Sequence, residues 1–251
     1  MHGQCLQAVI SRSDSIVFAS GGNGTMSSYC LMHSSGQGPE GWKLLVQELE
    51  RRGHRVLTPA FRVNRTDEGL VYHAETIVEA LQRSGLQSGE VVCVAHSASG
   101  MYLPLVAERW PLRRMVFLAA AVPRPGISVM DQLRADPSMF NPAWLGKNPM
   151  EDDVALEFVF HDCPPARLDW ALSTRVLFYA KRAMEEPCPL RAWPDVPASY
   201  IVCADDRTIT PAWQRRAARA WLGVEPIELP GGHCPNVSRP EALADVLERV
   251  A

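Results

Sequence analysis

Apolar positions along the chain follow two alternating patterns. Short runs of β-prone apolar residues occur at 29–32, 55–58, 91–94, 115–119, 199–203 and 226–229. Between them, apolar residues recur at the i, i+3, i+4, i+7 spacing of one helix face, as in the segments 42–49 and 74–81. Strands that are apolar throughout and alternate with amphipathic helices predict a parallel sheet covered on both faces. The sequence therefore predicts a doubly wound, mostly parallel α/β fold.

The alternation stops between about 122 and 195. Helix-compatible stretches at 131–135, 153–161 and 166–184 lie there, separated by prolines. This segment is predicted to be a helical cap over the sheet. The strand and helix alternation then resumes, with a helix whose cap is Thr210 and whose first residue is Pro211, and a last helix that starts from a capping box of Ser238 and Glu241.

The first 25 residues differ from the remainder, because they are mostly small and polar with a single short apolar run at 16–19. We expect 1–25 to be a loosely ordered extension, with Met26 as a candidate start. The full chain of 251 residues is 47% hydrophobic, and residues 26–251 suffice for a single large α/β domain that carries the cap.

Charge and cysteine content narrow the classes of partner. The formal net charge is -3 and the 25 Lys and Arg residues are scattered, so neither a nucleic acid nor an anionic membrane surface is expected to bind. Seven cysteines without metal-ligand spacing indicate free thiols in a reducing compartment, and no metal site is expected. Without a signal sequence or a long apolar run, we expect a cytoplasmic protein that acts on a small molecule as a monomer or homodimer.

One strand runs directly into a serine flanked by small residues. Residues 91–100 read Val-Val-Cys-Val-Ala-His-Ser-Ala-Ser-Gly, and a helix-compatible stretch follows. A strand, a tight turn and a helix around Ser97, with Ala95 and Ser99 two positions to either side, form a relaxed nucleophile elbow. The pattern predicts that Ser97 Oγ projects above the carboxyl end of the sheet.

Two further polar sites follow later strands on the same rim. Asp205 and Asp206 come after the strand 199–203, and His233 comes after the strand 226–229. A serine hydroxyl is a weak nucleophile until an imidazole takes its proton and a carboxylate orients that imidazole. The order Ser97, Asp, His233 is the one that α/β hydrolases use, and the residues alone leave both aspartates as candidate acids.

With these residues in view, the chain resembles the α/β-hydrolase superfamily, and within it the plant methylesterase and hydroxynitrile lyase-like group and its bacterial relatives. The resemblance covers residues 29–251 and is clearest at 117–126, 206–211 and 230–235. The family's acid motif, an Asp followed by a basic residue and by Pro five positions after the Asp, selects Asp206 over Asp205. The resemblance implies a cofactor-free carboxylic ester hydrolase of the α/β-hydrolase type.

The resemblance also implies an oxyanion hole formed by the backbone N–H groups of Ser35 and Ala98. Ser34 stands where esterases of the group carry Gly and lyases carry Thr, so its hydroxyl is a candidate substrate contact. The lyases place a Lys directly after the catalytic His, where this chain has Cys234. Two rival functions stay open: a lyase, elimination or cyclisation reaction with His233 as base, and a ligand receptor without turnover.

Two other histidines are expected to have structural rather than catalytic roles. His96 is expected to pack or hydrogen-bond beneath the elbow, and His33 to brace its loop. The run His161-Asp162-Cys163 looks like part of a metal site, but nothing in the sequence completes a tetrahedral set.

Overall fold

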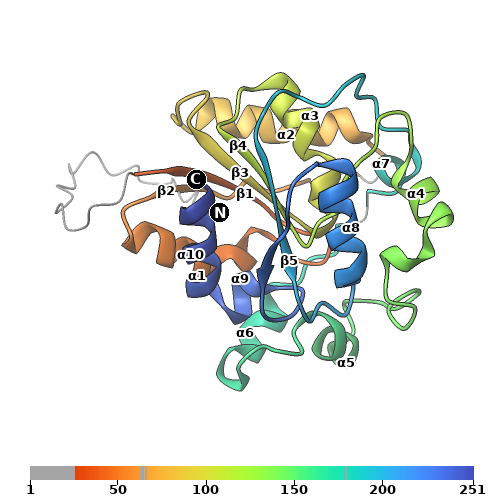
Figure 1. Cartoon of the computed structure of the whole chain (residues 1–251). Helices are drawn as coiled ribbons and strands as arrows, with labels where there is room; N and C mark the ends of the chain where they lie inside the picture. The colour runs from red at the N-terminus through yellow and green to blue at the C-terminus, as the bar shows by residue number, and fades with distance from the viewer. Residues whose placement is uncertain (1–25, 63–64, 66, 179) are drawn as a thin grey trace, which may run out of the picture.

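The computed structural model describes residues 26–62, 65, 67–178 and 180–251. A sheet of six strands lies at its centre, between helices (Figure 1). The predicted extension at 1–25 lies outside the described residues. Every neighbouring pair of strands is parallel, in the order β2-β1-β3-β4-β5-β6, which confirms the predicted fold class. The strands are β1 (Ser28–Met32), β2 (Arg55–Leu57), β3 (Val91–His96), β4 (Arg114–Leu118), β5 (Ala198–Cys203) and β6 (Ile227–Leu229).

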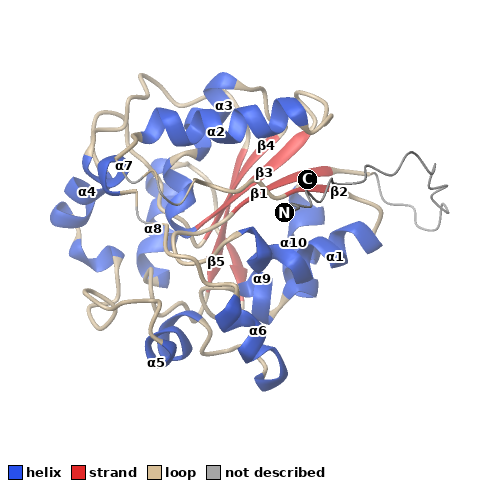
Figure 2. Ribbon diagram, turned by 180° about the vertical axis from the view of Figure 1, so that it is seen from behind, coloured by secondary structure: helices blue, strands red, loops and turns tan. Residues whose placement is uncertain are grey.

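Helices cover both faces of the sheet, as continuously apolar strands require (Figure 2). Helices α1 (Lys43–Arg51) and α10 (Pro240–Val250) pack on one face against alternate strand residues such as Val92 and Val94. Helices α2 (Leu70–Arg83), α3 (Leu103–Arg109) and α8 (Pro211–Trp221) pack on the other, against residues such as Cys93. The central strand β3, which leads to Ser97, is therefore buried along its whole length.

Residues 119–197, which we call the β4–β5 segment, contain only short helices. These are α4 (Val129–Ala135), η3 (Pro137–Met139), α5 (Asp152–Val154), the π-helix η4 (Ala155–Val159), η5 (Pro165–Arg167), α6 (Leu168–Ser173) and α7 (Lys181–Glu185). Elsewhere lie the short elements η1 (Pro39–Trp42), η2 (Ser97–Met101) and α9 (Pro235–Ser238).

The helix predicted over 166–184 is wrong as one element. Helix α6 ends at Ser173, and none of the described residues from 174 to 180 is helical. The reason is tertiary: the carbonyl of Thr174 accepts the N–H of Gly38, and the N–H of Phe178 donates to the carbonyl of Ser35. These bonds to the loop after β1 replace the helical bonds that the periodicity of 166–184 predicted.

Of the two predicted helix caps, one is confirmed and one is wrong. Thr210 Oγ1 accepts the N–H of Trp213 at 3.3 Å, with Pro211 as the first residue of α8. The capping box does not form, because α10 starts at Pro240 after Arg239, and Ser238 ends the separate helix α9. The Ser238 hydroxyl instead donates to the carbonyl of Cys234 at 3.3 Å.

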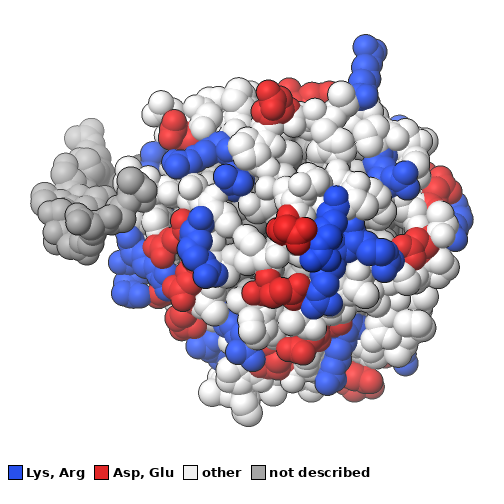
Figure 3. Space-filling view, viewed as in Figure 1, with Lys and Arg blue, Asp and Glu red and all other residues white. Residues whose placement is uncertain are grey.

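Within the described residues, no helix has the length and apolar character needed to cross a bilayer. Figure 3 shows acidic and basic side chains interspersed over the face seen there.

Candidate active site

The turn after β3 holds Ser97 in a backbone conformation that few side chains adopt. Its φ is +58°, in the left-handed region, and such a residue costs about 1–3 kcal/mol that the surrounding packing must offset. The helical turn η2 starts at Ser97 and packs so closely on the chain after β4 that a Cβ on Gly100 would lie 2.1 Å from the carbonyl oxygen of Ala121. The sequence pattern pointed to Ala95 and Ser99 but missed this requirement for Gly100.

Hydrogen bonds beneath the elbow fix it to neighbouring segments. The Ser99 hydroxyl lies 3.0 Å from the carbonyl oxygen of Met32, at the end of β1, and 2.9 Å from that of His96. His96 is buried, and its Nε2 donates to the carbonyl of His233 at 2.7 Å. His96 therefore braces the loop that carries His233.

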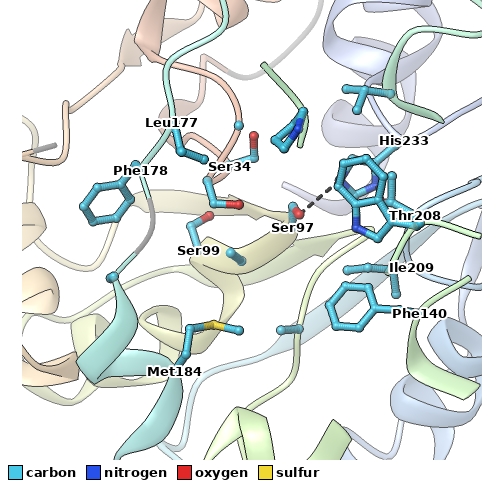
Figure 4. A pocket seen from close by; sticks show the side chains of 18 of the residues that line it. Ser34, Ser97, Ser99, Phe140, Leu177, Phe178, Met184, Thr208, Ile209 and His233 are labelled. Atoms are coloured by element: carbon cyan, nitrogen blue, oxygen red, sulfur yellow. Dashed lines mark hydrogen bonds between the residues drawn. The ribbon is translucent and has the colours of Figure 1, made fainter. Parts of the chain in front are cut away.

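Ser97, Asp206 and His233 follow the carboxyl ends of three strands and meet in one hydrogen-bonded line, of which Figure 4 shows the bond between Ser97 and His233. Ser97 Oγ lies 3.0 Å from His233 Nε2, and His233 Nδ1 lies 2.8 Å from Asp206 Oδ2. A carboxylate only accepts, so Nδ1 carries the proton and Nε2 is free to accept from the serine hydroxyl. His233 and Asp206 are both buried, whereas Ser97 opens onto a cavity.

Two residues that the sequence pattern missed hold Asp206 in place. Thr208 donates both its N–H and its hydroxyl to Asp206 Oδ1, at 2.7 and 3.0 Å, and its Oγ1 lies 2.8 Å from His233 Nδ1. Gln214 Nε2 donates to Asp206 Oδ2 at 2.8 Å. The sequence could have indicated a structural role for Gln214, because it is a polar residue on the buried face of α8 beside Trp213 and Ala217.

The loop after β1 is oriented by His33. The N–H of Phe61 donates to His33 Nε2 at 3.1 Å, so the ring proton sits on Nδ1, which donates to the carbonyl of Ser34 at 2.9 Å. Since the C=O and N–H of one peptide unit point in opposite directions, the N–H of Ser35 is directed away from His33. Ser34 and Ser35 both line the cavity with Ser97 and Ala98.

This cavity has a volume of about 480 Å³ and is lined mainly by apolar side chains. Phe61 packs against Tyr102 and Phe178, and Leu177 and Met184 lie on the same side as Phe178, whereas Phe140 and Ile209 lie on the opposite side. Trp144 and Val159 also line the cavity. In Figure 4, Ser97 lies between these groups, with Ser34 on the side of Phe178 and His233 on the side of Ile209. More than half of the lining residues belong to the β4–β5 segment.

Other residues singled out in the sequence analysis lie away from this line. Asp205 is exposed, and its Oδ2 accepts the N–H of Gly231 at 3.1 Å, so it does not contact His233. Cys234 is buried and is absent from the lining of the cavity, and burial raises the pKa of its thiol well above the usual range. Among the described residues, no group of three His, Cys, Asp or Glu side chains could hold a metal ion, the run at 161–163 included.

The model of the alpha/beta hydrolase family matches residues 16–246. This chain belongs to the alpha/beta hydrolase family. Membership confirms both the resemblance seen in the sequence and the expected enzyme class, a hydrolase.

Curated relatives of this hydrolase share about a quarter of its residues. Salicylic acid-binding protein 2 of Nicotiana tabacum is 26% identical over 89% of this chain and 96% of its own length. The pyrethroid hydrolase of Sphingobium wenxiniae is 24% identical over 89% of this chain and 87% of its own. Among solved structures, polyneuridine aldehyde esterase superposes with a TM-score of 0.75 at 18% identity, covering 90% of this chain and 99% of that one.

We expect the hydrolase to lose stability as the pH falls below about 6.5, the usual pKa of histidine. Burial lowers the pKa of His33, His73 and His96, so the unfolded chain takes up protons there that the folded chain does not. The folded state is therefore fully favoured above pH 6.5 and loses up to about 1.4 kcal/mol per pH unit for each histidine below it. The melting temperature at pH 7.5 and 5.5 measures this loss, and His73→Phe should reduce it. Equal melting temperatures for the unmodified protein at both pH values would contradict the expectation.

Proposed function

We propose that this hydrolase cleaves a carboxylic ester through an acyl-enzyme formed on Ser97. The observation that carries the proposal is the line from Ser97 Oγ to His233 Nε2 and from His233 Nδ1 to Asp206. It joins a nucleophile, a base and an orienting acid at hydrogen-bond distances. The ligand-receptor alternative would have no need for this complete line.

In the proposed reaction, Ser97 Oγ attacks the ester carbonyl while His233 Nε2 takes the hydroxyl proton. The C–O bond to the alcohol then breaks, and His233 returns the proton to the departing alcohol. Water repeats the sequence on the acyl-enzyme, releasing the carboxylic acid and restoring the Ser97 hydroxyl. Asp206 holds Nδ1–H throughout, which keeps Nε2 in the accepting form and stabilises the imidazolium.

The N–H groups of Ser35 and Ala98 are proposed to hold the oxyanion. Ala98 is the second residue of η2, at a helical turn start where N–H groups have no intrahelical acceptor. His33 binds the carbonyl of Ser34 and so sets the plane of the peptide that carries the Ser35 N–H. One such donor is worth about 10²–10³ in rate. The buried Ser34 hydroxyl lines the same part of the cavity and is a candidate contact for the substrate.

A neutral, largely apolar ester fits the cavity best. Its volume of about 480 Å³ suits a ligand of drug size, and its walls are mostly aromatic and aliphatic. Two basic residues line it: Lys147 is exposed to solvent, and Arg175 is engaged by the carbonyls of Leu172 and Pro149 and by an ion pair with Asp152. We propose that the β4–β5 segment acts as the cap that selects the substrate. The names of relatives, pyrethroid hydrolase and methylesterase among them, support ester hydrolysis.

The position of Cys234 also favours hydrolysis over the lyase alternative. Lyases of the resembling group use a Lys directly after the catalytic histidine. Here the residue is a cysteine, buried in an apolar cluster with Phe160 and Val237. No cationic side chain stands at that place to assist the departure of an anion.

The test is covalent labelling by a small fluorophosphonate, followed by intact mass and peptide mapping. A single adduct on Ser97 is expected, with none on Ser97→Ala, because the reagent reacts only with an activated serine. Turnover of p-nitrophenyl acetate should disappear in the same variant. A folded unmodified protein that shows neither adduct nor turnover would overturn the acyl-enzyme, and an adduct on another residue would overturn Ser97 as the nucleophile.

A further inference from the structure

The turn Gly231-Gly232, directly before His233, is held by a carboxylate from the β4–β5 segment. Asp162 Oδ2 accepts the N–H of Gly232 at 2.9 Å. The Asp162 side chain is only 12% exposed, so this charge-assisted bond is largely shielded from water. The same oxygen lies 3.5 Å from Arg239 Nε, beyond the other end of the His233 loop.

The contact is too tight for any side chain at the two glycines. A Cβ on Gly232 would lie 2.6 Å from His161 Nε2 and 2.7 Å from Asp162 Oδ1. A Cβ on Gly231, whose φ is +121°, would lie 2.7 Å from Asp162 Oδ2. The backbone before His233 is therefore pressed directly onto the His161–Asp162 turn.

Asp162 makes this contact at a cost. Its Oδ1 is buried and has no hydrogen-bond partner among the described residues. A buried carboxylate oxygen without a partner is unfavourable by roughly 1–3 kcal/mol, so a residue kept there calls for a reason. Fixing the backbone of a catalytic loop is such a reason.

Neighbouring contacts bind the same two segments together. His161 Nε2 donates to the carbonyl of Asp205 at 3.0 Å, and Arg167 Nη1 donates to the carbonyl of Val237 at 3.1 Å. A buried apolar cluster joins Phe160, Cys163 and Ala171 of the β4–β5 segment to Cys234 and Val237, which follow His233. The loop of His233 thus rests on the β4–β5 segment on one side and on His96 on the other.

We propose that Asp162 is a positioning residue for His233: by holding the N–H of Gly232 it keeps the imidazole between Ser97 and Asp206. This inference rests on the proposed function, because it assigns His233 the role of base. It links the folding of the β4–β5 segment over the cavity to the alignment of the catalytic histidine. Removing the carboxylate lets the turn shift, and a displacement near 1 Å is enough to cost about 10²-fold in rate.

The experiment compares Asp162→Ala with Asp162→Asn in the full chain. Asp162→Ala should lower kcat for p-nitrophenyl acetate about 10- to 100-fold with little change in KM, because alignment rather than substrate binding is lost. The rate of fluorophosphonate labelling should fall in parallel. Asp162→Asn should recover most of both rates, since its amide oxygen can still accept the Gly232 N–H.

A proton NMR signal separates positioning from loss of fold. The Nδ1–H of His233, hydrogen-bonded to Asp206, should give a low-field resonance that is absent in His233→Ala. We expect this resonance to shift or broaden in Asp162→Ala and to stay in place in Asp162→Asn. Asp153→Ala is the matched control, since Asp153 is an exposed acid of the same segment and no hydrogen bond of its side chain occurs among the described residues.

Full kcat and an unmoved resonance in Asp162→Ala would overturn the proposal, and so would an Asn variant as impaired as the Ala variant. If Asp162→Ala does not fold, Asp162→Ser, whose shorter side chain withdraws the acceptor, takes its place with the same expectations. Failure of the proposed function looks different. In that case the unmodified protein does not label at Ser97, while the His233 resonance still reports whether Asp162 positions the ring.

Discussion

Asp206→Asn is expected to lower kcat/KM by about 10⁴-fold with the fold retained, the scale seen when a triad acid loses its charge. Three donors fix Asp206 Oδ1, namely the N–H and hydroxyl of Thr208 and the N–H of Ile209. In the variant, the amide oxygen therefore takes the position of Oδ1, and the amide nitrogen takes that of Oδ2.

The consequence for His233 is a change of tautomer. The new amide N–H donates to His233 Nδ1, so the ring proton moves to Nε2 and points at Ser97 Oγ. Nε2 then cannot accept the serine proton. In the parent, Gln214 Nε2 lies 2.8 Å from Asp206 Oδ2, so the variant brings the NH₂ groups of residue 206 and Gln214 face to face. This loss of a buried hydrogen bond lowers the free energy of unfolding by about 1–3 kcal/mol.

Steady-state kinetics with p-nitrophenyl acetate, together with circular dichroism, measure both effects. Asp205→Asn provides the comparison, because among the described residues the Asp205 carboxylate accepts only the Gly231 N–H, and an amide oxygen can replace it there. Its loss of rate should stay below about tenfold, the span of a single neutral hydrogen bond. If Asp205→Asn were the more damaging variant, Asp206 would not be the acid of the triad.

Gly100→Ala is expected to destabilise the protein by about 3 kcal/mol or more, the upper range for one added methyl in a close-packed site. The new Cβ would lie 2.1 Å from the carbonyl oxygen of Ala121 and 2.9 Å from the Cβ of Ala120. Neither can withdraw easily, because the Tyr200 hydroxyl donates to the Ala120 carbonyl and accepts the Ala120 N–H. The added methyl must therefore push η2 away from the sheet and move Ser97.

Thermal unfolding should show the effect as a fall in the melting temperature of about 6–12 °C, given about 2–4 °C per kcal/mol for a chain of this size. Labelling of Ser97 should fall with it. Gly36→Ala is a suitable control for stability, because its nearest contact would be the Cβ of Pro149 at an ordinary 3.8 Å. An unchanged melting temperature in Gly100→Ala would contradict this prediction, because it would show that η2 can accommodate the added methyl group.

Local signals were enough to predict the sheet and to select Ser97, His233 and an aspartate at position 205 or 206. Each of these residues follows an apolar strand, and parallel strands bring their carboxyl ends to one edge whatever the helices between them do. Asp206 needed more than local signals, because only the resemblance to a family motif separated it from Asp205.

The remaining features depended on contacts that no local pattern contains. The segment 166–184 has a helical periodicity, yet the carbonyl of Thr174 and the N–H of Phe178 bond to the loop at 35–38. The capping box at Ser238 has the right residues, yet Ser238 was already the end of another helix. The run His161-Asp162-Cys163 looked like part of a metal site, whereas the Asp162 carboxylate accepts the backbone N–H of Gly232, seventy residues away. Tertiary structure decided each of these cases.

The order of the strands along the chain also determines the stage of synthesis at which the proposed catalytic residues can come together. Ser97 and His233 are 136 residues apart in the sequence, and β6, which leads to His233, joins the sheet at its edge after β5. A growing chain therefore carries Ser97 long before it carries His233, its proposed base. Because a chain elongates at about 5–20 residues per second, the proposed mechanism implies that the serine waits for roughly 7–27 seconds of translation before it can be activated. Under that mechanism, reactivity towards a fluorophosphonate reports that β6 has joined the sheet.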